Sequence, residues 1–198
     1  MLSRRALLSC LSIPLASAAA APRSAAAGLA RPSTNRRNFP NVTLITHDGE
    51  PVRFYDDLVK GRIVLFNFFY TRCDGICSPA TSNLRKVQDL LGDRVGRDTF
   101  MYSITLKPKE DSPAAIKAYR DSYEVKPGWT FLTGSPANCD LIRRRLGFAD
   151  VDPKVDRDVT QHSGLVVFGN EALDRWAACP AVSNPSEIVK AVSWMDWS

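Results

Sequence analysis

The segment Ile63–Leu91 of this 198-residue chain reads IVLFNFFYTRCDGICSPATSNLRKVQDLL. It opens with Ile63–Phe69, where apolar residues occupy both faces of an extended chain, a pattern typical of a buried strand in an α/β sheet. It closes with Ser78–Leu91, which we predict to be a helix. Cys73 and Cys77 lie in the connection between the two. The segment therefore predicts a strand, a turn with two thiols, and a helix.

The predicted helix carries a start signal and a stop signal. Ser78 can accept a hydrogen bond as the N-cap, and Pro79 suits the first helical position. Gly92 is a typical residue just past the end of a helix. Three apolar residues recur at helical spacing and form one stripe: Leu84, Val87 and Leu91. We expect this stripe to be the buried face of the helix.

Before this unit, the sequence predicts a hairpin and a short helix. Two short strands, Val42–Thr46 and Val52–Phe54, flank the segment HDGEP, in which Asp48-Gly49 suits a hairpin turn. Asp56–Lys60 is expected to be a short helix. The hairpin therefore precedes the buried strand along the chain.

After this unit, strands and helices alternate until a second hairpin. The predicted elements are a strand at Thr99–Leu106, a helix from Ser112-Pro113 to Tyr119, a strand at Trp129–Leu132, a helix from Ser135-Pro136 to Gly147, a strand at Leu165–Phe168, a strand at Leu173–Ala178 and a final helix at Pro185–Trp194. In the helix that ends at Gly147, three residues are expected to face inward: Leu141, Ile142 and Leu146. The last two strands are expected to pair across a turn at Gly169-Asn170. A β-α-β unit followed by an antiparallel hairpin and a helix is the thioredoxin plan. We therefore predict an α/β, thioredoxin-like fold: a central mixed sheet flanked by helices, with an N-terminal β-hairpin and an inserted helical crossover.

The N-terminal residues are typical of an export signal. Arg4-Arg5 precede an uncharged stretch, and small residues suited to cleavage follow at Ala16-Ser17-Ala18. We expect residues 1–22 to be a signal peptide, or alternatively a retained anchor that tethers the protein to a membrane. Residues 23–38 are expected to be a flexible linker and residues 39–198 the folded domain. This places the domain in an exported, oxidising compartment, periplasmic or facing the outer side of the inner membrane.

Composition argues against a nucleic-acid partner. The formal net charge is +5, but six arginines precede the predicted domain, and without them 20 basic residues face 21 acidic ones. No stripe of Lys and Arg interleaved with aromatic residues is present. A chain of this length, 44% hydrophobic, suits one well-buried domain.

The pair Cys73 and Cys77 indicates reactive or metal-binding chemistry. At the carboxyl end of a strand and the N-terminus of a helix, free N–H groups favour the thiolate, and Gly75 lets the turn fold tightly. A thiolate serves as a redox nucleophile or as a soft-metal ligand. A structural zinc site would need a second close pair, whereas Cys139 and Cys179 are isolated. A structural disulfide stays as the alternative.

A metal held by two thiolates from one turn needs a third ligand, and the chain has two histidines. His47 lies in the predicted hairpin and is expected to be an exposed turn residue. His162 precedes the strand Leu165–Phe168, whose start should lie at the sheet edge where Ile63–Phe69 ends. Cys73, Cys77 and His162 would then converge, although an ordinary loop histidine stays an alternative. Two thiolates with one imidazole suit copper as Cu(I) or Cu(II).

Four segments together resemble the Sco/SenC family of copper-handling, thioredoxin-like proteins: FFYTRCDGICSP, SITLKPKEDSPAAIKAY, RRRLGF and QHSGLVVFGN. The similarity covers about Phe39 to Trp197. It implies copper binding by Cys73, Cys77 and His162. It also implies delivery of copper to the binuclear copper centre of cytochrome c oxidase, or reduction of the cysteines there. The partner would be the copper-accepting subunit of that oxidase, or another copper or dithiol protein.

The sequence departs from the family pattern at two places. Many members carry an acidic residue directly before the histidine, but this chain has Gln161. Many have proline within the cysteine turn, where this chain has Asp-Gly-Ile. Neither change removes a ligand, but Gln161 bears on how His162 is oriented.

Two other functions compete with a copper chaperone. In a thiol-disulfide oxidoreductase, the more exposed thiolate of Cys73 and Cys77 would attack a target disulfide and the other would resolve it. A thiol peroxidase of the peroxiredoxin type places threonine three residues before its cysteine, whereas this chain has Tyr70 there and Thr71 one residue later. The peroxidase is therefore the least favoured function.

The remaining signals are expected to be structural. Lys107–Asp111 is predicted to be a solvated loop and Arg143–Arg145 the wet face of a helix. Cys139 and Cys179 are expected to be buried thiols, with a mutual disulfide as the alternative. Three tryptophans are expected to pack in the core and against the last helix: Trp176, Trp194 and Trp197.

Overall fold

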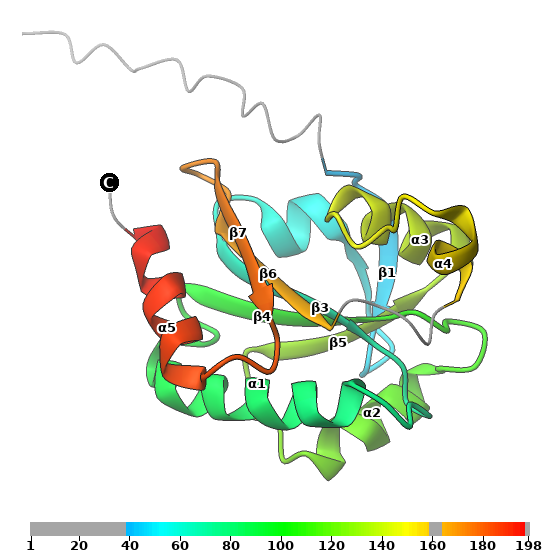
Figure 1. Ribbon diagram of the computed structural model, residues 1–198, viewed down its shortest axis with the longest axis horizontal. Coiled ribbons are helices and arrows are strands. Elements are labelled where there is room, and N and C mark those ends of the chain that lie inside the picture. The colour runs from blue at the N-terminus through cyan, green and yellow to red at the C-terminus, as the bar shows by residue number, and fades with distance from the viewer. Residues whose placement is uncertain (1–38, 159–163, 197–198) are drawn as a thin grey trace, which may run out of the picture. The chain divides into compact units, whose positions relative to one another are not determined.

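The computed structural model describes residues 39–158 and 164–196. In these residues the strands form one seven-stranded sheet in the order β2-β1-β5-β4-β3-β6-β7 (Figure 1). The strands are β1 (Thr43–Thr46), β2 (Pro51–Arg53), β3 (Ile63–Phe69), β4 (Thr99–Thr105), β5 (Trp129–Gly134), β6 (Leu165–Asn170) and β7 (Arg175–Pro180). The predicted α/β class and the N-terminal hairpin are confirmed.

The helices follow the predicted order. They are α1 (Cys77–Leu91), α2 (Pro113–Ser122), α3 (Pro136–Arg145), α4 (Pro153–Arg157) and α5 (Pro185–Ser193), with a π-helical segment η2 (Phe54–Val59) and 3-10 turns η3 (Gly92–Arg94) and η5 (Trp194–Asp196). The predicted crossover is the pair α3 and α4, which lies between β5 and β6 along the chain. No helix in residues 39–158 and 164–196 is long and apolar enough to cross a bilayer.

The strand directions bring the turn after β3 and the segment before β6 to one edge of the sheet. β3 pairs in parallel with β4, and β4 with β5, whereas β6 runs antiparallel to β3. Asn67 near the end of β3 faces Val166 near the start of β6. The turn that follows β3 and the residues that precede β6 therefore meet at the same edge, as the sequence predicts.

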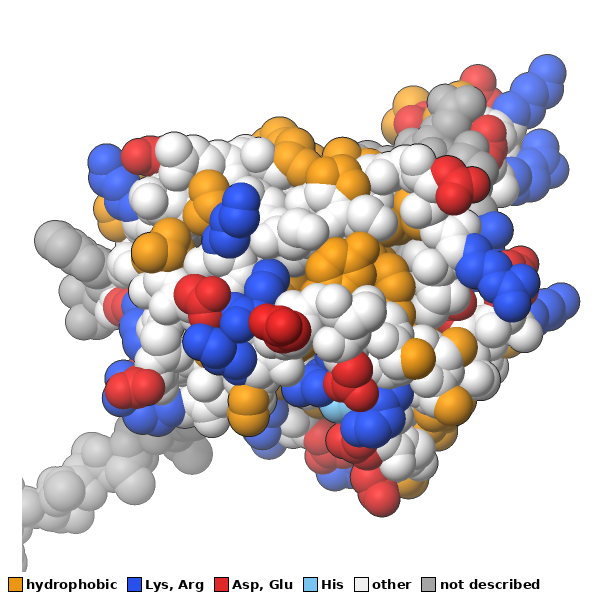
Figure 2. All heavy atoms as spheres, turned by 90° about the horizontal axis from the view of Figure 1, so that it is seen from below, with side chains coloured by type: hydrophobic (Ala, Val, Ile, Leu, Met, Phe, Trp, Pro, Cys, Tyr) orange, Lys and Arg blue, Asp and Glu red, His pale blue; other side chains and the backbone are white. Residues whose placement is uncertain are grey.

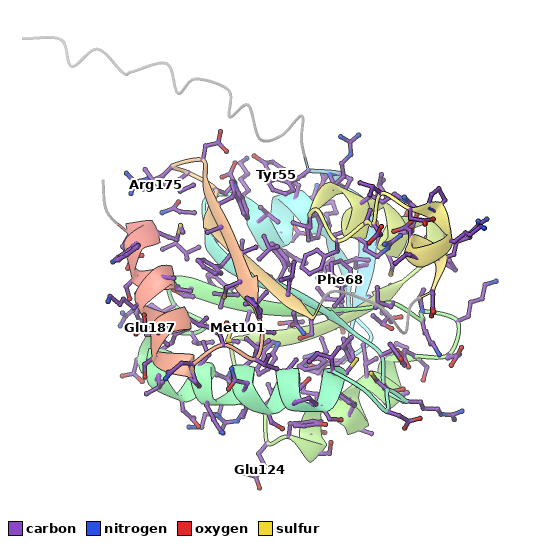
Figure 3. All side chains as sticks on the ribbon, in the orientation of Figure 1. Tyr55, Phe68, Met101, Glu124, Arg175 and Glu187 are labelled. Carbon is purple, nitrogen blue, oxygen red and sulfur yellow. The ribbon has the colours of Figure 1, made fainter. Side chains whose placement is uncertain are left out.

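The sheet separates two layers of packed side chains. α1, α2 and α5 lie on one side of the sheet, and η2 and α3 on the other (Figure 1). Within β3, Leu65 and Phe69 face the first layer, and Phe66 and Phe68 face the second. Figure 3 shows Met101 and Phe68 on opposite sides of the sheet. β3 is buried throughout because both of its faces are covered.

The one polar side chain of β3 is satisfied by its neighbours. The Ser103 hydroxyl donates to Asn67 Oδ1 at 2.7 Å, and the Trp129 indole N–H donates to the Ser103 oxygen at 2.8 Å. All three residues are almost fully buried. These bonds connect β3, β4 and β5 below the edge at which the cysteine turn begins.

The outer face of α1 and α2 carries charges of both signs (Figure 2). Asp89, for example, forms ion pairs with Arg85 and with Lys126, each at 2.6 Å. Such exposed pairs contribute at most about 1 kcal/mol each. The fold is therefore held by its two apolar layers.

Two predicted boundaries are wrong. α1 begins at Cys77, and the N-cap is Ile76, whose carbonyl accepts from the Ala80 N–H. Ser78 thus lies inside the first turn. The turn of the last hairpin is also displaced, because Gly169 and its neighbour continue β6 and pair with the start of β7. The chain reverses at residues 171–174.

Three predicted environments and one predicted helix also need correction. Leu141 is 37% exposed, and only Ile142 and Leu146 of that set are buried. Trp194 is 63% exposed, whereas Trp176 packs on Phe39 with ring centroids 4.9 Å apart.

The short helix near Asp56–Lys60 starts at Phe54 and has π geometry. The side chain of Arg143 is only 12% exposed, because it pairs with Asp140 and Asp156. Trp197 lies outside the described residues.

Candidate metal centre

The cysteine turn occupies the junction between β3 and α1. Cys73 lies in the turn and is half-buried, and Cys77 is the first residue of α1 and is 1% exposed. No side chain caps α1, and no acidic residue lies in its first turn. The first N–H groups of a 15-residue helix are therefore available to a sulfur anion.

The Cys73 sulfur accepts hydrogen bonds from several donors. Burial by itself would raise the pKa of Cys73. Hydrogen bonds from the Cys77 thiol, the Tyr70 hydroxyl and the backbone N–H groups of Cys77 and Gly75 outweigh burial and lower that pKa below the ordinary value. A Cβ at Gly75 would lie 3.9 Å from this sulfur, so the turn passes close to it. Cys73 is therefore the more readily ionised thiol of the pair.

Cys77 has the opposite character. Burial, together with its hydrogen bond to Cys73, raises the pKa of Cys77 to about 12. In the metal-free protein this thiol stays protonated at neutral pH and donates to its neighbour. The pair thus contains one nucleophilic sulfur and one buried sulfur, an asymmetry that the spacing alone did not reveal.

Tyr70 is a site residue that the sequence reasoning missed. Its ring is buried, its hydroxyl bonds to Cys73, and the Lys107 ammonium lies 4.5 Å from the ring centroid. The hydrogen bond to Cys73, followed by burial, raises the pKa of Tyr70. The available signal was its position directly after a buried strand, where a side chain can turn back toward the cysteine turn.

Asp111 anchors the start of the cysteine turn, so the prediction that Lys107–Asp111 is a solvated loop is wrong at this residue. Asp111 is 1% exposed. Its carboxylate accepts from the Thr71 hydroxyl at 2.5 Å, from the Thr71 N–H and from the Thr105 hydroxyl. A buried carboxylate is tolerated there because each oxygen has donors. The Thr71 hydroxyl is thereby committed to Asp111, which argues further against a peroxidase.

His162 lies in residues 159–163, outside the described residues. Gly164, the next described residue, lies against Ile76: a Cβ at Gly164 would be 2.7 Å from Ile76 Cγ1. The segment that carries His162 therefore joins the described fold beside the cysteine turn. Within residues 39–158 and 164–196, no three His, Cys, Asp or Glu side chains gather as a metal site.

His47 is less exposed than predicted. Its side chain is 10% exposed, its Nδ1 accepts from the Phe131 N–H at 3.3 Å, and its Nε2 lies 3.3 Å from Asp48. Burial is the main reason that the pKa of His47 is lowered. These contacts give His47 a structural role between β1 and β5.

The other two cysteines are thiols, and no disulfide joins them. Cys139 is 3% exposed, and burial raises its pKa to about 12. Cys179 is half-buried in β7. The prediction of buried thiols is confirmed for Cys139 and holds in part for Cys179.

A thioredoxin-like sheet with an asymmetric thiol pair at a strand–helix junction defines a class of dithiol proteins. The family model described as SCO1/SenC matches residues 32–195. The chain belongs to the SCO1/SenC family.

Its relatives agree with this assignment. Protein sco1 of Schizosaccharomyces pombe is 30% identical over 126 residues, which cover 61% of this chain and 46% of that protein. The SCO1 protein homolog of Bacillus subtilis is 30% identical over 93 residues, 46% of this chain and 47% of the relative. The chain thus spans about half the length of these two relatives.

Solved structures show the same fold. The structure of Bradyrhizobium japonicum ScoI with copper bound superposes with a TM-score of 0.62 at 23% identity and covers 77% of this chain and 96% of that one. The structure of BsSco, described as a member of the Sco family of cytochrome c oxidase assembly proteins, has a TM-score of 0.63 at 24% identity. The superposition covers 78% of this chain and 90% of that one. At these identities the likeness shows the thioredoxin-like fold.

Proposed function

We propose that this protein is a copper-binding chaperone that holds one copper ion with Cys73, Cys77 and His162. The observation that carries the proposal is the hydrogen-bonded pair of sulfurs at the open N-terminus of α1. Family membership and the copper-bound structure of a relative support it. The client would be the binuclear copper centre of cytochrome c oxidase, or another copper or dithiol protein.

Covalent geometry supports the inclusion of His162. Consecutive Cα atoms are about 3.8 Å apart, so the Cα of His162 lies within about 7.6 Å of the Cα of Gly164. Gly164 packs on Ile76, the residue directly before Cys77. His162 is therefore the histidine that we assign to the two sulfurs as the third ligand.

The ligand chemistry favours copper over harder ions. Thiolates select soft ions such as Cu(I), and an imidazole also suits Cu(II). Loading must displace the proton of Cys77, because its pKa of about 12 keeps it protonated in the metal-free protein. Copper uptake should therefore release protons and require reduced cysteines.

Residues 1–38 lie outside the described residues, and we propose that they direct export. Residues 1–22 would act as a signal peptide or a membrane anchor, and residues 23–38 as a linker. A Bacillus anthracis relative described as a SCO1/SenC family lipoprotein supports a location outside the cytoplasm. Periplasmic exposure would let the domain meet a copper site on the outer side of the membrane.

The test of the chaperone function uses the two histidines as matched variants. The reduced chain is titrated with Cu(I) against a competing chelator, and affinity is compared among wild type, His162→Ala and His47→Ala. We expect one ion per chain, a loss of affinity of more than tenfold in His162→Ala, and wild-type affinity in His47→Ala. Unchanged affinity in His162→Ala would show that this histidine is not a ligand.

A thiol-disulfide reductase is the second candidate, favoured by the asymmetry of the pair. The Cys73 thiolate would attack a target disulfide and form a mixed disulfide. Cys77 would then attack Cys73, so that the target leaves with two thiols and the protein keeps a Cys73–Cys77 disulfide. Cys77→Ser should trap the mixed disulfide with a disulfide-bonded client, and His162→Ala should leave reduction unchanged.

A further inference from the structure

β7 is an open edge of the sheet. It pairs with β6 on one side and is the last strand in the sheet order. Figure 1 shows β7 at the front of the sheet, with no described helix or strand in front of it. Natural proteins usually protect such edges with charges, prolines or bulges, because unpaired backbone groups can accept another strand.

The register shows which backbone groups of β7 face outward. The Ala181 N–H donates to the Gly164 carbonyl at 2.8 Å, and hydrogen-bonded pairs alternate with non-hydrogen-bonded ones in an antiparallel ladder. Trp176, Ala178 and Pro180 therefore direct their backbone groups away from β6. The inward pairs are Val166–Cys179, Phe168–Ala177 and Asn170–Arg175.

Pro180 fits this alternation, since its missing N–H would point outward. Its carbonyl accepts from the Ser183 N–H at 2.9 Å. The outward N–H and C=O groups of Trp176 and Ala178 have no hydrogen-bond partner within residues 39–158 and 164–196. The centre of β7 thus offers two complete donor–acceptor sets.

The side chains along this edge are small or apolar. Ala178 is exposed, and Trp176 beside it on the same face packs on Phe39. Leu173 and Val182, just beyond the ends of the strand, are 38% and 46% exposed. Arg175 supplies the one charge of β7 and lies at the outer end of the hairpin (Figure 3). The middle of β7 therefore carries no charged side chain that would oppose pairing with another strand.

We infer that β7 is a self-association edge, at which β7 of one copy pairs antiparallel with β7 of a second copy. The twofold axis passes through Ala177, so that Trp176 of each copy faces Ala178 of the other. Each of these two pairs exchanges two hydrogen bonds. On the shared face a large ring lies over a methyl group, which fits without a clash.

Other symmetric registers are poorer. Pairing Trp176 with itself would place Ala178 opposite Asp174, which precedes β7 and has a φ of +52°, so that it is not extended. Pairing Ala178 with itself would place Trp176 opposite Pro180, which has no N–H to donate and whose carbonyl is already used. The Ala177 register is the one in which all outward groups of both central residues are satisfied.

The residues of β7 that pair in the dimer include none of the candidate metal ligands. The pairing residues Trp176–Ala178 precede Ala181, whose partner Gly164 packs on Ile76 beside the cysteine turn. An interface of one strand from each copy is small, below about 1,200 Å², so association should be reversible. Copper stoichiometry then serves as an independent control, and failure of the dimer leaves the proposed function untouched.

The first test removes one outward donor. Sedimentation velocity is measured over a concentration series for wild type, Ala178→Pro and the control Ala178→Ser, which keeps its N–H. We expect wild type and Ala178→Ser to shift from monomer towards dimer together, and Ala178→Pro to stay monomeric while it binds copper normally. A wild type that is monomeric at every concentration, or an Ala178→Pro variant that dimerises equally, would overturn the inference.

The second test checks the register by oxidation. Residues in a non-hydrogen-bonded pair have Cα atoms about 4.5 Å apart, which suits a disulfide. In a background of Cys73→Ser, Cys77→Ser and Cys179→Ser, Ala177→Cys should give a covalent dimer and Ala178→Cys should not. The reverse pattern would refute this register. Concentration-independent protection of the Trp176 and Ala178 amides from hydrogen exchange in a monomer would show instead that residues 1–38 cover the edge.

Discussion

A single hydroxyl, that of Tyr70, helps to lower the pKa of Cys73 in the cysteine turn. Tyr70 stands at the end of β3 with its ring buried, and its O–H reaches the sulfur of Cys73. Hydrogen bonds to an anionic acceptor are stronger than those to a neutral one. The turn therefore favours ionisation of Cys73 through a donor that lies outside the CxxxC motif itself.

Tyr70→Phe should raise the pKa of the Cys73 thiol, because it removes a hydrogen bond to the charged form, and such a bond contributes about 1.5–3 kcal/mol. The rate of iodoacetamide alkylation of metal-free, reduced protein, measured against pH, reports this pKa. The control is Tyr55→Phe, which removes a buried hydroxyl that donates to Glu171. If the alkylation profile of Tyr70→Phe matched that of wild type, the hydroxyl would have no role at the sulfur.

At the scale of elements, α4 is joined to α3 by charge. Asp156, 4% exposed, pairs with Arg143 at 2.5 Å and Arg144 at 2.7 Å. Its hydrogen bond from Arg143 holds the pKa of Asp156 well below its usual range. α4 has five residues, and none of them is buried as a whole, so these pairs account for its attachment.

Acid should therefore weaken this attachment. A carboxyl whose pKa is depressed in the folded state stabilises that state above its unfolded pKa of about 3.9, and the contribution is lost as the pH falls below that value. We expect the free energy of unfolding to decline below about pH 4 in wild type, and to decline less steeply in Asp156→Asn. Urea unfolding at a series of pH values measures it, with the exposed Asp93→Asn as control. Identical acid limbs in the three proteins would contradict the assignment.

The loops before β4 and β5 cross closely at Gly128. This residue has φ +86°, and a Cβ there would lie 2.5 Å from the backbone N of Gly96. Gly49 has a similar φ of +89° but no atom within 4 Å of its Cβ position. The two glycines thus separate backbone conformation from steric contact.

Gly128→Ala should cost more than 2 kcal/mol of stability, since two backbones must move apart, whereas Gly49→Ala should cost about 1 kcal/mol for the left-handed conformation alone. Chemical denaturation of both variants gives the comparison. Equal losses would mean that the close approach is relieved at little cost.

At the scale of the whole molecule, copper binding should increase the stability of the folded state. A ligand that binds only the folded state stabilises it by about 2.7 kcal/mol when present at one hundred times its dissociation constant. We expect Cu(I) to raise the thermal midpoint of the reduced chain and to leave Cys73→Ser/Cys77→Ser unchanged. A shift of equal size in the double variant would place the copper elsewhere.

The sequence by itself determined the order of the elements and the position of the thiol pair. Local periodicity sufficed for β3, and Ser-Pro pairs sufficed for the starts of α2 and α3, where Ser112 and Ser135 cap the helices as predicted. Such signals depend on neighbours within a few residues, and a chain carries them before it folds.

Only the tertiary structure decided which residues support the site. The sequence KPKED predicts a solvated carboxylate at Asp111. In the structure Asp111 is buried, and its carboxylate accepts hydrogen bonds from Thr71 and Thr105, which follow and end two neighbouring strands. The difference between Cys73 and Cys77, the burial of Arg143 and the bare edge of β7 likewise depend on partners far along the chain. Burial and hydrogen bonding are properties of the assembled surroundings, so no local pattern of residues encodes them.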